Sequence, residues 1–165
     1  MDDQQAQFER TVGDAFIEWY NNSIGVSFEF SARPENAPDL HYEDGANQLV
    51  LEITGAYYDS LDATLRWQNL RKVANAPTGW GGKDMDESLL DDISTRIRKK
   101  CRNRYGADCI LVIYVHPAMT LKEEVDELLR RIEIPHDSPF AGIYLTGHFP
   151  HSTTSWGGYM CWKLA

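Results

Sequence analysis

The chain has 165 residues, of which 42% are hydrophobic, and its 25 acidic and 16 basic residues give a formal net charge of −9. This length and apolar content predict one domain over residues 1–165 with a substantial core. The negative charge disfavours a protein that binds nucleic acid over its whole surface, because phosphates are neutralised by clustered Lys and Arg.

The first residues, MDDQQAQFER, are acidic and polar, whereas a secretory signal begins basic and then turns apolar. No apolar run approaches the roughly 18 residues of a membrane span. The three cysteines, Cys101, Cys109 and Cys161, are odd in number and lack Cys-x-x-Cys spacing, which disfavours a disulfide framework. These features predict a cytoplasmic protein with reduced thiols and no membrane partner.

Residues 4–21 are predicted to form the first helix, because their apolar residues recur at helical spacing and make one face. These residues are Phe8, Val12, Ala15, Phe16 and Trp19. Glu9 and Glu18 fall at opposite margins of this face. Each is expected at a solvated helix edge, and the alternative is that one of them turns inward to join acids further along the chain.

Residues 26–30 alternate and predict a strand, and the next two strands form a hairpin around Asp44-Gly45. Asp-Gly between two alternating runs is a strong hairpin signal, because Gly accepts the positive φ of the turn without steric cost. Asp39 opens the first arm. On the second arm, Glu52 points to the face opposite that of the leucines. The two carboxylates are therefore expected at facing positions.

Residues 56–73 could hold a helix, and residues 74–85 carry the turn-forming residues of a loop insertion. Within this loop, Trp80 and Lys83 could stack on and pair with a nucleic acid, or the loop is an ordinary insertion. A phosphate-binding Walker loop is excluded, because Asp84 stands where that motif requires Ser or Thr.

Residues 86–105 form the clearest predicted helix, with acids in its first turn and basic residues near its end. At about 100° per residue, Lys100 falls on the inward margin of the apolar stripe, whereas Lys99 falls opposite it. Arg98, Lys99 and Arg102 would then form an outward positive stripe. That stripe either contacts nucleic acid or only caps the helix dipole and aids solubility.

The continuous apolar run of residues 109–115 predicts a strand that is buried on both faces and central in its sheet. Residues 121–131 have helical periodicity, and residues 140–145 and 159–164 read as further strands. The predicted fold class is α/β, with a mixed central sheet flanked by helices.

Pro38-Asp39, a short strand, a turn and then Leu51-Glu52-Ile53-Thr54 resemble the PD-(D/E)xK nuclease superfamily. The element order over residues 5–145 is similar to the restriction-endonuclease-like αβββαβ core of that family. Thr54 departs from the pattern, which has a Lys two positions after the second acid. The segment Ile97-x-x-Lys100 followed by Tyr105 resembles members that supply this Lys from the next helix.

The resemblance implies a nuclease in which Asp39 and Glu52 hold Mg²⁺ or Mn²⁺, while Lys100 orients the attacking water or stabilises the transition state. It also implies that Glu9, from the first helix, approaches the metal. Because two neighbouring acids repel, one of them should have a raised pKa without metal. The substrate would be nucleic acid, DNA in preference to RNA, contacted by Lys83, Arg98, Lys99 and Arg102.

Other functions remain open at this point. A catalytically degenerate relative that binds a protein partner is favoured by Thr54 and by the net charge of −9. An α/β domain with an unrelated small-molecule site is a third reading. A zinc site at His148, His151 and Cys161 is disfavoured, because this spacing matches no closed set of four ligands.

Overall fold

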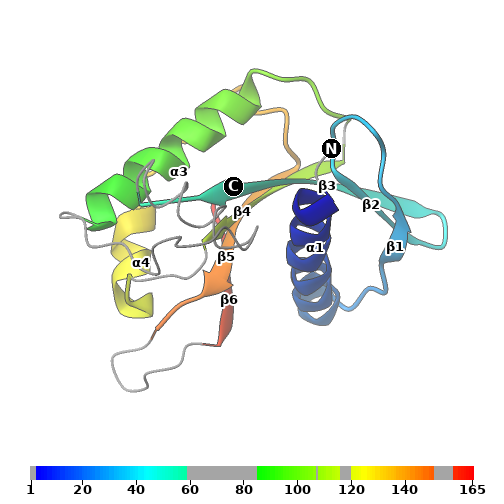
Figure 1. Cartoon of the computed structure of the whole chain (residues 1–165), viewed down its shortest axis with the longest axis horizontal. Helices are drawn as coiled ribbons and strands as arrows, with labels where there is room; N and C mark the ends of the chain where they lie inside the picture. The colour runs from blue at the N-terminus through cyan, green and yellow to red at the C-terminus, as the bar shows by residue number, and fades with distance from the viewer. Residues whose placement is uncertain (1–2, 59–84, 107, 116–119, 151–157) are drawn as a thin grey trace.

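A computed structural model of the chain describes residues 3–58, 85–106, 108–115, 120–150 and 158–165. Within these ranges it contains three helices and six strands, labelled in Figure 1. The helices are α1 (Asp3–Ile24), α3 (Met85–Cys101) and α4 (Lys122–Leu129). The strands are β1 (Glu29–Ala32), β2 (Leu40–Asp44), β3 (Asn47–Ala56), β4 (Cys109–Val115), β5 (Gly142–His148) and β6 (Tyr159–Lys163).

The six strands form one mixed sheet in the order β1-β2-β3-β4-β5-β6. Strands β1, β2 and β3 pair antiparallel as a meander, β4 pairs parallel with both β3 and β5, and β6 pairs antiparallel with β5. Strand β4 was predicted to be central and buried, and all but one of its residues are buried between two parallel neighbours. The predicted α/β class, a mixed sheet flanked by helices, is confirmed.

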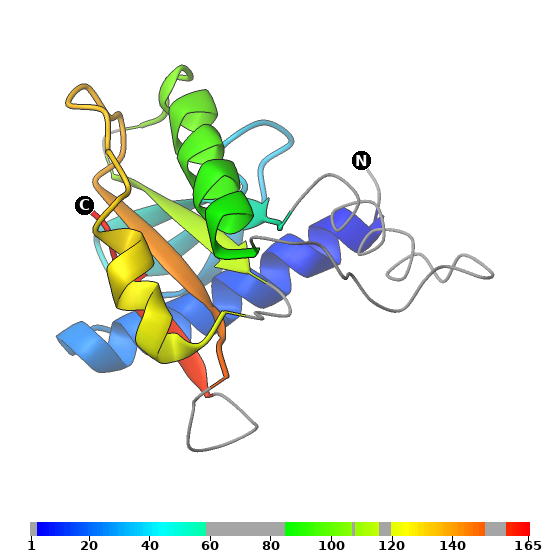
Figure 2. The same ribbon diagram turned by 90° about the vertical axis from the view of Figure 1, so that its left-hand side faces the viewer.

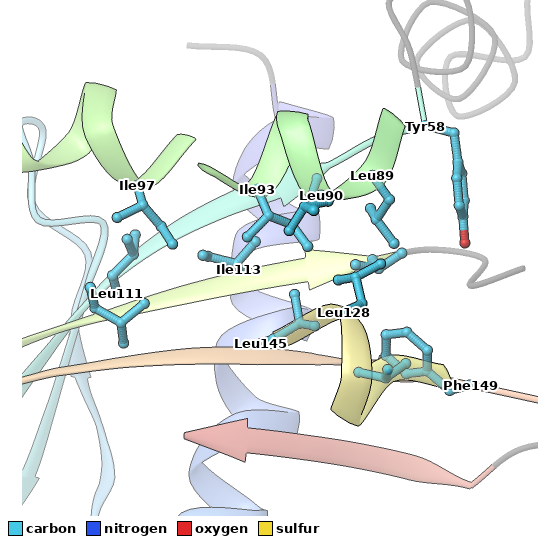
Figure 3. Packing of buried hydrophobic residues seen from close by; sticks show 14 residues of the cluster. Tyr58, Leu89, Leu90, Ile93, Ile97, Leu111, Ile113, Leu128, Leu145 and Phe149 are labelled. Carbon is cyan, nitrogen blue, oxygen red and sulfur yellow. The ribbon is translucent and has the colours of Figure 1, made fainter. Parts of the chain in front are cut away.

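Helix α1 covers one face of the sheet, and α3 and α4 cover the other (Figure 2). The core beneath α3 and α4 is mainly aliphatic, with Ile93, Leu111 and Leu145 fully buried in it (Figure 3). The core beneath α1 is richer in aromatic rings, including those of Phe16 and Tyr144. Burial of each such side chain contributes about 1.5–3 kcal/mol to the free energy of folding. The two cores therefore hold the helices against the two faces of the sheet.

The predicted hairpin is confirmed, with a one-residue change in its turn. Asp44 pairs with Asn47, so the two-residue loop is Gly45-Ala46 rather than Asp44-Gly45. Gly45 has a φ of 61°, a conformation that glycine adopts without steric cost.

The register of this hairpin aligns the two predicted acids. Leu40 pairs with Leu51, and the next positions outward from the turn are Asp39 and Glu52. Asp39 thus comes one residue before the last printed pair, and its carboxylate accepts the Ile53 N–H next to Glu52.

The first strand begins at Glu29 instead of residue 26. The Asn21 side chain accepts a hydrogen bond from the Phe28 N–H at 3.0 Å and donates one to the Phe28 carbonyl at 2.9 Å. The Ser27 N–H donates to the Asp44 carboxylate at 3.1 Å. Side chains therefore take the backbone groups that a longer strand would have used.

The helix predicted over residues 86–105 ends at Cys101. Strand β5, predicted over residues 140–145, spans Gly142–His148. The predicted helix in residues 56–73 and the loop insertion at 74–85 fall outside the described residues, apart from residues 56–58 and Met85. Among the described residues, no helix is both long enough and apolar enough to cross a membrane.

Candidate functional site

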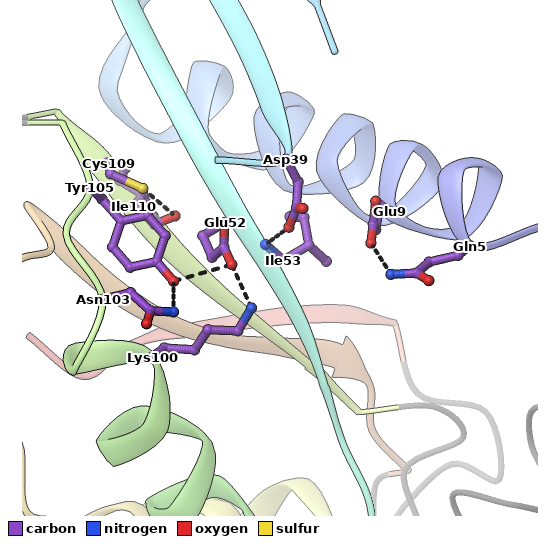
Figure 4. Close-up of polar contacts among 10 residues, drawn as sticks. All are labelled: Gln5, Glu9, Asp39, Glu52, Ile53, Lys100, Asn103, Tyr105, Cys109 and Ile110. Atoms are coloured by element: carbon purple, nitrogen blue, oxygen red, sulfur yellow. Dashed lines mark hydrogen bonds and ion pairs between the residues drawn. The ribbon is translucent and has the colours of Figure 1, made fainter. Parts of the chain in front are cut away.

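The Glu52 carboxylate lies in the middle of the sheet, where β3 pairs with β4, and only 3% of its surface is exposed. Its Oε1 accepts two hydrogen bonds, from the Lys100 ammonium at 2.5 Å and from the Tyr105 hydroxyl at 3.2 Å. Its Oε2 is also buried and has no hydrogen-bond partner among the described residues. Figure 4 shows that both contacts converge on the same oxygen of Glu52.

Asp39 is held beside Glu52 by the backbone of β3. Its Oδ2 accepts a hydrogen bond from the Ile53 N–H at 2.8 Å. The pKa of Asp39 is raised to about 6, mainly by burial and then by the negative charge of Glu52. The hydrogen bond from Ile53 lowers the pKa by less than Glu52 raises it. The expectation that one acid of the pair has a raised pKa is met at Asp39, with burial as the larger cause.

Lys100 reaches the acids from the last turn of α3. Ile93 and Ile97 on the same helix are fully buried against the sheet, which directs the margin bearing Lys100 towards β3. Its side chain is 25% exposed, so the ammonium is partly shielded from water. The sequence predicted that this lysine faces the sheet, and the structure places it on Glu52.

Tyr105 is a contact of Glu52 that sequence reasoning did not identify. In a helix continuing to residue 105, this side chain would point away from that of Lys100, since five residues turn the helix by about 500°. The helix instead ends at Cys101, and the Asn103 N–H donates to the Lys100 carbonyl at 3.0 Å as the chain turns. Burial raises the pKa of Tyr105 to about 12, so its hydroxyl stays protonated and can donate at neutral pH.

Glu9 lies near these acids but has its own partners. It is 6% exposed, and Glu18, the other candidate of α1, is exposed. One oxygen of Glu9 accepts a hydrogen bond from Gln5 at 2.8 Å, and the other forms an ion pair with Arg33 at 2.6 Å. Arg33 could not be paired with Glu9 from the sequence, because it lies 24 residues away in a loop.

A hollow of about 350 Å³ has Glu9, Asp39 and Lys100 in its lining. It is lined by α1, by the entrance to β2, by the end of β3 and by one flank of α3. Its charged and polar lining residues are Gln5, Glu9, Asp39, Thr54, Tyr57, Arg96, Lys99, Lys100 and Asn103.

Arg98, Lys99 and Arg102, predicted to form an outward positive stripe, are all exposed. Lys99 was predicted to lie opposite the buried face and is exposed, and it also lines the same hollow as Asp39. Arg98 lines a different hollow, towards the end of α4, and Arg102 is exposed. The difference arises because neighbouring helical residues diverge by about 100°, which sends Arg98 and Lys99 to opposite flanks. Lys83 lies outside the described residues.

Arg96 is a second basic residue of this hollow that the sequence did not single out. Its guanidinium lies 3.3 Å from both Asp92 carboxylate oxygens and 5.4 Å from the centre of the Tyr57 ring. The Asp92 carboxylate also accepts the Tyr57 N–H at 2.8 Å, which ties the end of β3 to α3. Arg96 thus has a fixed position at the rim.

The acid pair supplies only carboxylate oxygens, which suit Mg²⁺ or Mn²⁺ better than they suit zinc. Among the described residues, no group of three or more His, Cys, Asp and Glu side chains is arranged to hold a metal ion. Mg²⁺, however, keeps several waters and needs only one or two protein carboxylates. Asp39 and the unpaired Oε2 of Glu52 fit that requirement. Of the disfavoured zinc set, His151 lies outside the described residues.

No protein-family model matches the sequence, and no curated protein matches it. Among solved structures, the chain is similar to Pyrococcus furiosus SfsA in complex with Ca²⁺, with a TM-score of 0.35 and 12% sequence identity. The likeness covers 94% of this chain and 61% of the SfsA chain. Function is therefore inferred from the geometry of the site.

Proposed function

We propose that this chain is a divalent-metal-dependent nuclease of the PD-(D/E)xK type, which hydrolyses phosphodiester bonds of DNA or RNA. The observation that carries the proposal is Oε2 of Glu52, buried near Asp39 without a hydrogen-bond partner among the described residues. A buried carboxylate oxygen that no donor satisfies is costly. A cation shared by the two acids would remove this cost and the repulsion between them.

Asp39 and Glu52 would hold Mg²⁺ or Mn²⁺, the ions that favour carboxylate and water oxygens. When bound, such an ion supplies a more acidic water and a positive charge at the phosphate. Asp39, with its pKa near 6, is mostly ionised above pH 7 and is then available as a ligand.

The cationic side chains around the hollow would bind the phosphate groups of the substrate. Lys100 places an ammonium at the acid pair, where it would stabilise the charge that grows on the phosphate oxygens during hydrolysis. Arg96 and Lys99 lie at the rim of the same hollow and would contact neighbouring phosphates. Arg96, Lys99 and Lys100 thereby bring positive charge to this hollow of an otherwise acidic protein.

Cleavage of supercoiled plasmid and of single-stranded RNA in Mg²⁺, Mn²⁺ or EDTA tests this proposal. We expect metal-dependent cleavage that falls by about 100-fold or more in Asp39→Asn and Glu52→Gln, since each loses a charged ligand. Asp44→Asn is the matched control, because Asp44 belongs to the same hairpin but lies at its turn. Folded protein that cleaves neither substrate in either metal would contradict the proposal, as would undiminished cleavage by the two site variants.

A catalytically degenerate, binding-only protein is the second candidate. It is favoured by the short ion pair between Lys100 and Glu52 and by the buried Thr54 at the position of the family's lysine. In this case nucleic acid or a protein partner would bind equally well in EDTA, and no substrate would be cut.

A further inference from the structure

We propose that Tyr105 is a positioning residue for the metal site, acting through Glu52. Its hydroxyl and the Lys100 ammonium would together hold Oε1 of Glu52, so that Oε2 is the oxygen presented to the cation. This inference rests on the proposed function and gives Tyr105 a role that the family resemblance did not assign to it.

The hydrogen bonds of Glu52 are unevenly distributed. Both donors, Nζ of Lys100 and the hydroxyl of Tyr105, bind the same oxygen, at 2.5 and 3.2 Å. Among the described residues, the other oxygen has no partner although it is buried. A carboxylate bound in this way cannot rotate about its last bond without breaking both contacts. The structure therefore fixes which oxygen remains available.

Tyr105 is itself held in place. Its oxygen accepts a hydrogen bond from the Asn103 side-chain amide at 3.2 Å, so its own proton is free to point to Glu52. Its ring packs against that of Phe140, with centroids 4.7 Å apart. The Asn103 backbone N–H is bonded to the carbonyl of Lys100, which links the two donors of Glu52 through one turn. Two neighbours thus set the position of the hydroxyl.

The Tyr105→Phe substitution isolates this role, because it removes the hydroxyl and keeps the ring on Phe140. Groups that orient a metal ligand usually change metal affinity by about 10- to 100-fold when they are removed. Lys100 still binds Oε1 in this variant, so we expect the lower end of that range.

Tyr42→Phe is the matched control. The Tyr42 hydroxyl also donates to a carboxylate, that of Asp14, at 2.9 Å, but it belongs to the core beneath α1. This variant loses the same kind of hydrogen bond on the other face of the sheet. It should reduce thermal stability without changing metal affinity.

The test is titration of Mn²⁺ into the full chain, with free Mn²⁺ measured by electron paramagnetic resonance and the melting temperature recorded beside it. We expect the Kd for Mn²⁺ to rise about tenfold in Tyr105→Phe and to stay at the wild-type value in Tyr42→Phe. An unchanged Kd in Tyr105→Phe, or an equal rise in both variants, would overturn the positioning role. Wild-type protein that binds no Mn²⁺ would overturn the proposed function and this inference with it.

If Tyr105→Phe fails to fold, Asn103→Ala tests the same arrangement from an exposed position. It removes the amide that directs the Tyr105 proton and should weaken Mn²⁺ binding by a smaller factor. Wild-type affinity in this variant would then count against the inference.

Discussion

Glu9 and Glu52 are the two carboxylates that are buried among the described residues, and they are satisfied in different ways. Each oxygen of Glu9 has a partner, Gln5 for one and Arg33 for the other. Both donors to Glu52 bind one oxygen and leave the second without a partner among the described residues. Burial alone therefore does not mark a functional acid. The unmet hydrogen-bonding capacity of Glu52 separates the two.

The largest expected effect follows directly from this difference. Glu52→Gln should lower the cleavage rate by about 100-fold or more, because a charged ligand is lost. Glu9→Gln should reduce cleavage less, but should lower the free energy of unfolding by about 1–3 kcal/mol, since Arg33 loses its ion-pair partner. Cleavage rates and urea unfolding of the two variants measure both effects.

Glu52→Gln should change stability less than Glu9→Gln does. It breaks the ion pair with Lys100 but also removes the repulsion that raises the pKa of Asp39. If Glu52→Gln proves the less stable variant and Glu9→Gln the less active one, the roles assigned to the two acids must be exchanged.

The next effect concerns the stability cost of the acid pair. Burial and the charge of Glu52 raise the pKa of Asp39 to about 6 in the folded chain, against an ordinary value of 3.8. The folded state therefore holds the proton more tightly than the unfolded state, and ionisation favours unfolding. The stability linked to this group is fully present below about pH 4 and is lost as the pH rises through about 6. The loss above pH 7 is roughly 2–3 kcal/mol.

Asp39→Asn should remove this dependence, because the amide oxygen can still accept the Ile53 N–H. In EDTA, we expect the variant to be more stable than the wild type at pH 7.5 and equally stable near pH 4, by denaturant unfolding at each pH. A constant difference between the two proteins across this range would show that Asp39 titrates normally. Mn²⁺ at pH 7.5 should raise the melting temperature of the wild type alone.

The fold and the acid pair could be predicted because their signals are local. Alternation and an Asp-Gly turn predicted the hairpin, but the observed loop, shifted by one residue to Gly45-Ala46, is the one whose register brings Asp39 next to Glu52. Helical periodicity also predicted that Lys100 faces the sheet, since the buried Ile93 and Ile97 determine which side of α3 does so.

The rest of the site depends on contacts between distant residues. Arg33 binds Glu9 from a loop, and nothing in the sequence around it indicates that pairing. Tyr105 reaches Glu52 only because α3 ends at Cys101, whereas periodicity favoured a longer helix. Lys99 is exposed, as helical periodicity predicted, but periodicity alone does not show that it also lines the hollow of Asp39.

The smallest expected effect distinguishes the two flanks of α3. Lys99 lines the hollow with the acids, and Arg98 lines another hollow near α4. Lys99→Gln should therefore raise the KM for nucleic acid several-fold. It should also reduce the slope of log K against log salt concentration by about one, the value for one lost phosphate contact. Arg98→Gln, which removes the same charge from the neighbouring position, should leave both near wild type. KM values for plasmid at several NaCl concentrations measure this directly. Equal losses in the two variants would mean that the substrate strand follows the outer surface of α3, as a single basic stripe would require, and does not enter the hollow that contains Asp39.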